Sequence, residues 1–504
     1  MKTIKRPLYV RLSRNSADVP FRSIAYSFHK EALDTNQEPN EAQSDEDKIS
    51  KDVASHGSGG SFLSRQLNNA FEYFLSSMEF YYSSASMLFG LYPMMIDITI
   101  NKHLLSDLQK NGNEVSKDNS SITFEVESNF MTSLDQTIEE LENLKASRKV
   151  VPKLLVINLV TTLDILMYNL IKEILAIKYD FLFKDNASIS YKELKDLGSV
   201  EAAKEYLIDR EVDVITRKNH YDQIKWIKDK LTLDFPLSND LMKSLIEVCE
   251  RRNLLVHTDG SVNHQYIRNC SEHNIDLSKT KRGERIALNP KYVRDSADVI
   301  FEFGSRITQA VWRNLYKKEI DEAAGALNGA AYSLIVKERF ELAQRLLNFG
   351  LSEFEKKESD LTRKMMIVNL ANAKKLSGDQ KSAIDILDGE DWSASSNKFK
   401  ICVAAVRGDD AEAIRLVPIV GKELRVEDYQ KWPVFRELRK NREFVSSVEG
   451  FFGMPMFGSE SAIAPEEAGK PDKRPSGTAA KRVSRRPGMT ASPSPRPRRR
   501  PTLQ

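Results

Sequence analysis

Residues 247–266, EVCERRNLLVHTDGSVNHQY, hold the side chains of this sequence that are best suited to chemistry. Arg252 and Asn253 are followed, after three residues, by His257. Histidine is the one of these whose ordinary proton affinity suits acid–base catalysis near neutral pH. Arginine carries a permanent, forked charge that matches phosphate oxygens. The spacing therefore combines an anion-binding group with an acid–base group.

A helix is expected to position these residues. Apolar side chains recur along it at helical spacing, and Arg252 and Asn253 continue two apolar stripes with polar groups. Pro236, Ser238 and Asn239 suit its N-cap region, and Gly260 suits the left-handed conformation that closes many helices. Residues five apart on an ideal helix point about 140° apart, so Arg252 and His257 do not share a face. Two copies of the chain, related by a dyad, would bring both charges to one target.

The pattern Arg-Asn-x3-His near a helix C-terminus resembles the signature of the HEPN superfamily. The domains of that family are all-helical, and many are metal-independent ribonucleases. The family signature is Arg, a polar residue, three variable residues and His, and it maps onto this sequence without a gap. A long apolar helix, expected over residues 150–179, precedes the motif, and another helix, over 290–315, follows it. The resemblance covers about residues 134–315.

The resemblance implies endoribonuclease activity without a metal or cofactor, in which the 2′-hydroxyl of RNA attacks the adjacent phosphate. His257 would supply acid–base catalysis, Arg252 would stabilise the transition state, and Asn253 would orient the imidazole or contact the sugar-phosphate. In the family the site is composite, made where two motif helices meet, which implies a homodimer. Arg251 and His264 are weaker candidates for substrate binding. A toxin or defence-type enzyme is the biological role that the resemblance suggests.

Other interpretations of these residues stay open. An arginine and a histidine near a helix C-terminus also suit the helix dipole, with no chemistry implied. The alternative function is a non-catalytic helical scaffold, in which the motif binds RNA or a nucleotide and the C-terminal repeats recruit protein partners. The nearby cysteines and histidines lack the paired spacing of a zinc site, so no metal is expected from Cys249, His257, His264, Cys270 and His273.

Composition sets the broad class of the protein. A chain of 504 residues suggests about two to four domains, and its net charge of +3 is nearly balanced. Three cysteines cannot form a disulfide framework, which fits a reducing, cytoplasmic setting. Residues 80–100 lack charge until Asp97, but hydroxyl-bearing residues and Pro93 interrupt them. We interpret this stretch as a buried or interfacial helix ending before Pro93, and expect no stable membrane insertion.

The expected fold class is all-α. Residues 1–33 are of unclear fold, with a short strand suggested over 8–12 and a short helix over 21–33. Residues 34–61 have the composition of a disordered linker. Residues 62–133 form a helical extension that completes or covers the next domain. Within it, the alternation of Ile122, Phe124 and Val126 predicts a short strand.

Residues 134–318 form the expected HEPN-like domain. One helix should end in the basic residues before Pro152, which suits the first turn of the next helix. Asp164 interrupts the apolar band of that second helix, and we expect it to face solvent rather than the site.

Residues 319–457 resemble degenerate tetratricopeptide repeats. Small residues and a Gly-Asp turn, at 378–379 and 408–409, recur between helical patterns. Such repeats usually present a surface to a protein partner, although these helices could equally buttress the dimer. Residues 458–504 form a basic, Pro- and Ser-rich tail that should be disordered. The tail could hold RNA electrostatically or remain solvated without a fixed partner.

Overall fold

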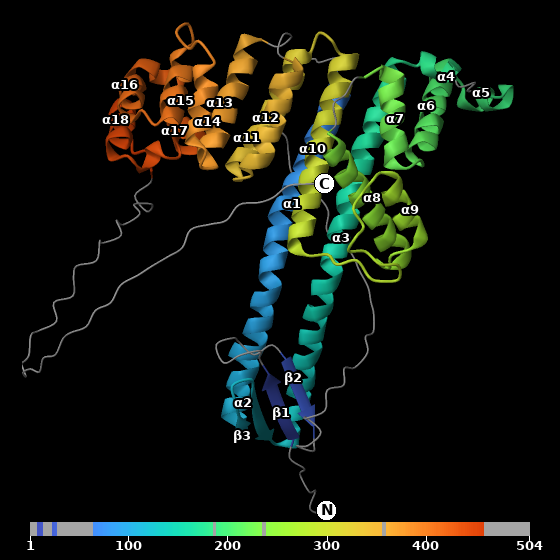
Figure 1. The fold of residues 1–504 in the computed structure, drawn as a ribbon, viewed down its shortest axis with the longest axis vertical. Coiled ribbons are helices and arrows are strands. Elements are labelled where there is room, and N and C mark those ends of the chain that lie inside the picture. Colours follow the sequence, from blue (N-terminus) through green and yellow to red (C-terminus); the bar gives the residue numbers. More distant parts are fainter. Residues whose placement is uncertain are drawn as a thin grey trace, which may run out of the picture. The chain divides into compact units, whose positions relative to one another are not determined.

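Two very long helices form the axis to which the other elements attach (Figure 1). The computed structural model describes residues 8–13, 23–27, 64–184, 188–233, 238–354 and 359–457. The linker expected over 34–61 and the tail expected over 458–504 lie outside these described residues. The described chain is mostly helical, as the sequence predicted, but it also contains a small antiparallel sheet.

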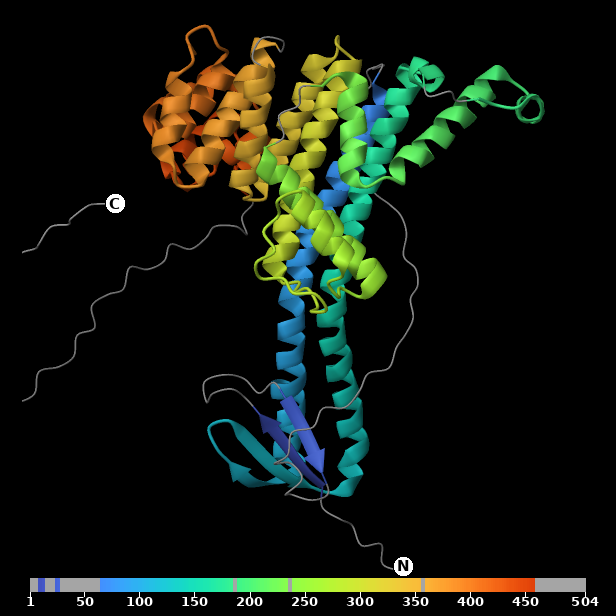
Figure 2. The same cartoon turned by 45° about the vertical axis from the view of Figure 1, so that its right-hand side comes forward.

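The two long helices pack side by side, and both views show them running together (Figures 1 and 2). The first consists of α1 (Arg65–Asp97), the π-helix η2 (Ile98–Leu104) and α2 (Leu105–Asn111) in succession. The second is α3 (Met131–Ile177), with 47 residues. At the usual rise, α3 is about 70 Å long.

Both of these helices continue through a proline, which corrects two expectations. Pro93 lies inside α1 and Pro152 inside α3, whereas the sequence predicted a helix end or start at each. An interior proline removes a hydrogen bond and costs about 3 kcal/mol. Pro152 is buried, and the contact between α1 and α3 supplies apolar burial on both sides of it. Packing along the pair therefore outweighs the local cost.

A four-stranded sheet covers one end of the helix pair. Its strands, in the order β2-β1-β4-β3, are all antiparallel. They are β1 (Leu8–Ser13), β2 (Ser23–Ser27), β3 (Gly112–Lys117) and β4 (Ser121–Val126). Alternate residues such as Val10 and Phe124 are buried against Ile100 and Leu134 of the helices.

The strands expected near residues 8–12 and 122–126 are confirmed by β1 and β4. The short helix expected over 21–33 is wrong for its described part, because Ser23–Ser27 forms β2. Val10 of β1 pairs with Tyr26 of β2 in the antiparallel register. The neighbouring strand thus supplies hydrogen bonds that local sequence preference cannot reveal.

A bundle surrounds the other end of the helix pair and carries the motif. The helices that build it are α4 (Asp180–Lys184), α5 (Tyr191–Leu197), α6 (Val200–Thr216), α7 (His220–Leu231), α8 (Asn239–Thr258), α9 (His264–Glu272) and α10 (Pro290–Leu315). α10 packs on both α1 and α3. A Cβ at Gly304 of α10 would lie 2.4 Å from the Phe74 ring of α1, so glycine permits this close approach. Helix α1 is therefore part of the core of the bundle.

One described stretch, Ser128–Ile177, is long and apolar enough to cross a membrane by length and composition. Half of its most apolar window is buried inside the protein, and α3 contacts α1, α6, α8 and α10. A buried core helix of this length meets the same criterion. Residues 80–100, the stretch that the sequence had singled out, do not meet it.

Stacked helical hairpins follow the bundle. They comprise α11 (Ile320–Val336), α12 (Phe340–Phe354), α13 (Asp360–Leu376), α14 (Gln380–Asp388), α15 (Asn397–Arg407), α16 (Asp410–Val420), α17 (Val426–Lys431) and α18 (Arg442–Phe452). Successive helices pack on one another in pairs. The two Gly-Asp turns are confirmed: Gly378 and Gly408 have φ of 94° and 78°, and Asp379 and Asp409 cap the helices that follow.

Candidate functional site

Local capping defines both ends of the motif helix α8. The Ser238 hydroxyl accepts a hydrogen bond from the backbone N–H of Leu241, as the sequence predicted for this N-cap. At the other end, Asp259 and Gly260 have φ of 50° and 82°. Both of their backbone N–H groups donate to the carbonyl of Leu254. The expected left-handed closure at Gly260 is confirmed, and it begins one residue earlier.

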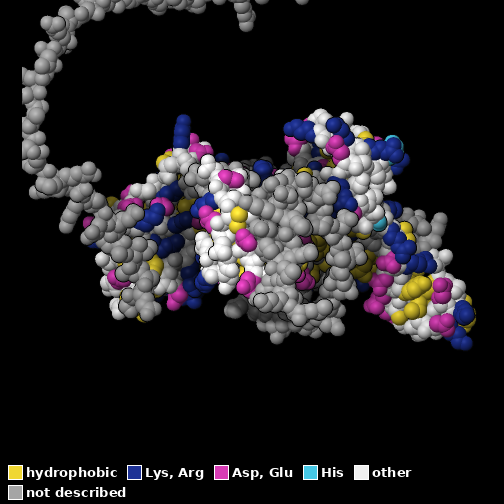
Figure 3. Space-filling view, turned by 90° about the horizontal axis from the view of Figure 1, so that it is seen from below, with side chains coloured by type: hydrophobic (Ala, Val, Ile, Leu, Met, Phe, Trp, Pro, Cys, Tyr) yellow, Lys and Arg dark blue, Asp and Glu magenta, His cyan; other side chains and the backbone are white. Residues whose placement is uncertain are grey.

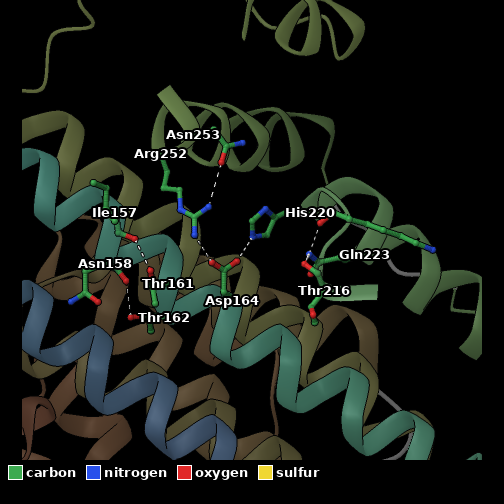
Figure 4. Close-up of polar contacts among 11 residues, drawn as sticks. Ile157, Asn158, Thr161, Thr162, Asp164, Thr216, His220, Gln223, Arg252 and Asn253 are labelled. Carbon is green, nitrogen blue, oxygen red and sulfur yellow. Dashed lines mark hydrogen bonds and ion pairs between the residues drawn. The ribbon is translucent and has the colours of Figure 1, made fainter. Parts of the chain in front are cut away.

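Asp164 of α3 joins the motif arginine to a histidine of α7 (Figure 4). Arg252 donates from Nη2 to Oδ2 of Asp164 at 3.0 Å, and Nε2 of His220 lies 2.8 Å from Oδ1. Nη1 of Arg252 also lies 3.4 Å from Oδ1 of Asn253. The Asp164 side chain is 35% exposed, and both of its oxygens are engaged. The expectation that Asp164 faces solvent rather than the site is therefore wrong, because the partly exposed carboxylate binds Arg252 of the motif.

These four residues lie at a cavity of about 500 Å³, which we call the α8 cavity. It is bounded by α3, by the turn between α6 and α7, and by α8 and α9. Polar side chains dominate its wall: Asp164, Arg217, Lys218, His220, Glu250, Arg252, Asn253, Asn269, Glu272 and His273. The structure thus brings two of the three motif residues, Arg252 and Asn253, to one polar cavity.

His220 is a cavity residue that sequence reasoning missed. Asn219 caps α7 through a bond from the Asp222 backbone N–H, which fixes His220 at the first helical position. Burial alone would lower the pKa of His220, but Cys249 and Asp164 outweigh it and raise the pKa to about 10. Asp164 thus favours the charged form of the imidazole. Nothing in the sequence around His220 links it to a motif on another helix.

Glu250, His273 and their partners also line the α8 cavity. Glu250 is buried, and one of its carboxylate oxygens accepts a hydrogen bond from Asn269 at 3.0 Å. Burial raises the pKa of this carboxyl. The His273 ring packs on Tyr221 with centroids 4.6 Å apart. The cavity therefore contains acid–base groups besides the motif, and sequence analysis assigned none of them.

Arg251 lies on another side of α8 and does not line the α8 cavity. Its guanidinium pairs with Glu247, donates to the carbonyl of Ala287 at 3.1 Å and lies 4.1 Å from the centre of the Tyr292 ring. Glu247 also accepts hydrogen bonds from the hydroxyls of Tyr266 and Tyr292. The side chains of Arg251 and Glu247 thus tie α9 and α10 to α8.

The two histidines predicted from the sequence lie outside the cavity. His257 is exposed on the last turn of α8, one turn beyond Asn253. His264 is the first residue of α9 and is also exposed. Within one chain, therefore, Arg252 borders the α8 cavity while His257 points to solvent beyond it.

No group of three potential metal ligands comes together among the residues that the structure describes. The cysteines Cys249, Cys270 and Cys402 are free and buried, and burial raises the pKa of Cys270 to about 12. Comparison with known proteins adds no relative: no protein-family model, curated protein or solved structure matches this chain. The resemblance to the HEPN superfamily therefore remains a proposal.

Proposed function

We propose that this protein is a metal-independent endoribonuclease of the HEPN type that acts as a homodimer. The observation that supports this most is the setting of Arg252. Asp164 holds the guanidinium at the α8 cavity through Nη2, while Nη1 makes only a 3.4 Å contact with Asn253. A guanidinium has five N–H donors, so donors remain for a phosphate at this cavity.

The chemistry follows from the residue types. The 2′-hydroxyl of RNA attacks the adjacent phosphorus, and the bond from phosphorus to the 5′-oxygen breaks. Arg252 stabilises the charge that develops on the phosphate oxygens, and the His220 cation adds to the positive potential. Asn253 contacts the sugar-phosphate, and His257 of a second copy exchanges protons with the attacking and leaving oxygens. The products are a 2′,3′-cyclic phosphate and a 5′-hydroxyl, and DNA is not cleaved.

The proposal is tested by incubating the full chain with mixed RNA in EDTA. Wild type is compared with Arg252→Ala and His257→Ala, and with His103→Ala as a control. His103 is exposed in η2, as His257 is in α8, but it lines no described cavity. Wild type and the control should leave cyclic phosphate ends, and the two motif variants should lose this activity. Equal cleavage by all four proteins would contradict the proposal, because the activity would not depend on the motif.

The non-catalytic alternative is favoured by one observation, the position of His257 outside the α8 cavity. In a scaffold the cavity would bind RNA or a nucleotide through Arg252 and His220, without an adjacent exposed histidine. RNA binding that depends on Arg252 but never produces cleavage would support this alternative.

A further inference from the structure

A second cavity, of about 490 Å³, lies between the first half of α3 and the end of α8. Five cationic side chains and one carboxylate contribute to its wall, and we call it the basic groove: Lys145, Arg148, Lys149, Lys153, Arg285 and Asp259. These charges sum to +4. On the face seen in Figure 3, by contrast, basic and acidic side chains are interspersed over most of the described surface.

Four of the five cations come from one face of α3. The spacing of Lys145, Arg148, Lys149 and Lys153 corresponds to i, i+3, i+4 and i+8, so these side chains are neighbours on the helix. Like charges at such spacing each destabilise a helix by a few tenths of a kcal/mol. Stability alone therefore does not favour this arrangement.

The one carboxylate of the groove is already shared by two cations. Asp259 lies 2.6 Å from Lys153 and 2.9 Å from Arg285, and the bond from Lys153 lowers the pKa of Asp259. Lys145 and Arg148 lie on the exposed surface of the same wall. The groove thus presents positive charge over about 12 Å of α3, from Lys145 to Lys153.

We propose that the basic groove binds the sugar–phosphate backbone of the RNA strand that is cut at the motif. This inference rests on the proposed function for the identity of the strand. Leu255 and Asp259 line the groove, and each is two residues from His257, or about 3 Å along the axis of α8. A strand in the groove therefore passes the end of α8. Side chains two residues apart on a helix point about 160° apart, so the groove and the His257 imidazole of one copy lie on different faces of α8, as a site completed by a second copy would require. A phosphodiester backbone, with one charge per nucleotide, suits a row of cations better than a single small anion does.

The groove and the α8 cavity lie at two different positions along α3. Lys153 lines the groove and Asp164 lines the cavity, and eleven residues of helix separate them by about 16 Å. Helix α8 packs on α3 and contributes residues to both walls. The groove would hold flanking nucleotides, while Arg252 binds the scissile phosphate.

The test measures how RNA binding depends on salt. A fluorescein-labelled 2′-O-methyl RNA is used with the full chain in EDTA, since this RNA lacks the nucleophile and cannot be cut. The groove variant is Lys145→Ala/Arg148→Ala/Lys149→Ala. The matched control is Lys192→Ala/Lys195→Ala/Lys381→Ala, which removes the same charge from exposed positions outside both cavities. The C-terminal tail is present in every variant, so its contribution is the same in all of them.

Each phosphate contact of a single strand contributes about 0.7 to the slope of log affinity against log salt. Loss of three contacts should lower the magnitude of the slope by about 2 and weaken binding about 100-fold at 0.1 M salt. The control variant should keep the wild-type slope. Asp259→Asn should act in the opposite direction and tighten binding, because it removes the one carboxylate that lines the groove in the described part of the chain, and asparagine tolerates the left-handed backbone.

Two results would refute the proposal that the groove binds RNA. One is an unchanged slope in the triple variant, and the other is equal competition by polyglutamate, which would assign the groove to acidic proteins. The outcome is separable from that of the proposed function. If the salt slope of the groove variant falls as expected but the wild-type protein never cleaves RNA, the RNA-binding groove is supported and the nuclease proposal is refuted. If the groove variant cleaves RNA with an unchanged kcat/KM and binds it with an unchanged salt slope, the nuclease proposal is kept and the groove proposal is refuted.

Discussion

Replacing Asp164 with asparagine tests the electrostatics of the α8 cavity most directly. The carboxylate accepts from Arg252 and from His220, at 3.0 Å and 2.8 Å. An amide of the same shape has only one acceptor oxygen, and its NH2 group would face one of the two donors. The variant therefore loses the charge that favours the imidazolium, and the pKa of His220 should fall from its raised value of about 10.

The sign of the pH dependence follows from this shift. In wild type the folded-state pKa of His220 lies above the unfolded value of about 6.5, so its stabilising contribution is complete below pH 6.5. That contribution is lost as the pH rises toward 10. One linked proton changes the free energy of unfolding by at most about 1.4 kcal/mol per pH unit. Between pH 7.5 and 8.5, wild type should therefore lose up to about 1.4 kcal/mol. Asp164→Asn should lose less, because the contribution of Asp164 to the raised pKa of His220 is removed while that of Cys249 remains.

Two measurements check this prediction. The imidazole NMR resonances of the seven histidines are titrated, and His220 is identified by the resonance that disappears in His220→Gln. Urea unfolding of wild type and Asp164→Asn is then compared at the two pH values, so that all other titrating groups cancel. An unchanged titration of His220 in Asp164→Asn, or equal pH dependence of the two proteins, would refute the reasoning.

Three further predictions concern the dimer, the core and the two adjacent arginines. Mixing Arg252→Ala with His257→Ala should restore about a quarter of wild-type cleavage. Half of the dimers are then mixed, and each mixed dimer has one intact composite site instead of the two of wild type. No recovery would mean that both residues act within one chain. Gly304→Ala should lower the free energy of unfolding by about 1–3 kcal/mol, measured by thermal melting, because its Cβ would clash with Phe74. Arg251→Leu should cost about 2–3 kcal/mol of stability, whereas Arg252→Leu should stay within about 1 kcal/mol of wild type while abolishing cleavage.

Local signals in the sequence predicted the parts of the fold that depend on local chemistry. A serine cap and a glycine stop fixed the ends of α8, because each satisfies backbone groups within a few residues. Alternation of Ile122, Phe124 and Val126 identified β4, since those side chains share the buried face of the sheet. The two Gly-Asp turns identified the hairpins, because each glycine adopts a left-handed conformation and each aspartate caps the helix that follows.

Tertiary contacts decided what the sequence could not reveal. The prolines in α1 and α3 signalled helix ends, but the two helices bury each other's apolar faces beyond each proline. The same limit applied to the site. Asp164 comes 88 residues before Arg252, and His220 lies on a third helix, so only folding makes them partners. A single sequence offers no spacing rule for such a group.

The two adjacent arginines of the motif show why stability alone does not account for the site. Arg251 is paired with Glu247, bonded to the Ala287 carbonyl and stacked on Tyr292, so packing and hydrogen bonds explain its presence. Nε of Arg252 is buried and has no hydrogen-bond partner among the described residues. A buried donor without a partner costs about 1–3 kcal/mol, and an apolar side chain would avoid that cost. The fold thus uses one arginine to hold α8 in place and tolerates a penalty to keep the other at the cavity, which supports the proposed role of Arg252 in binding an anion.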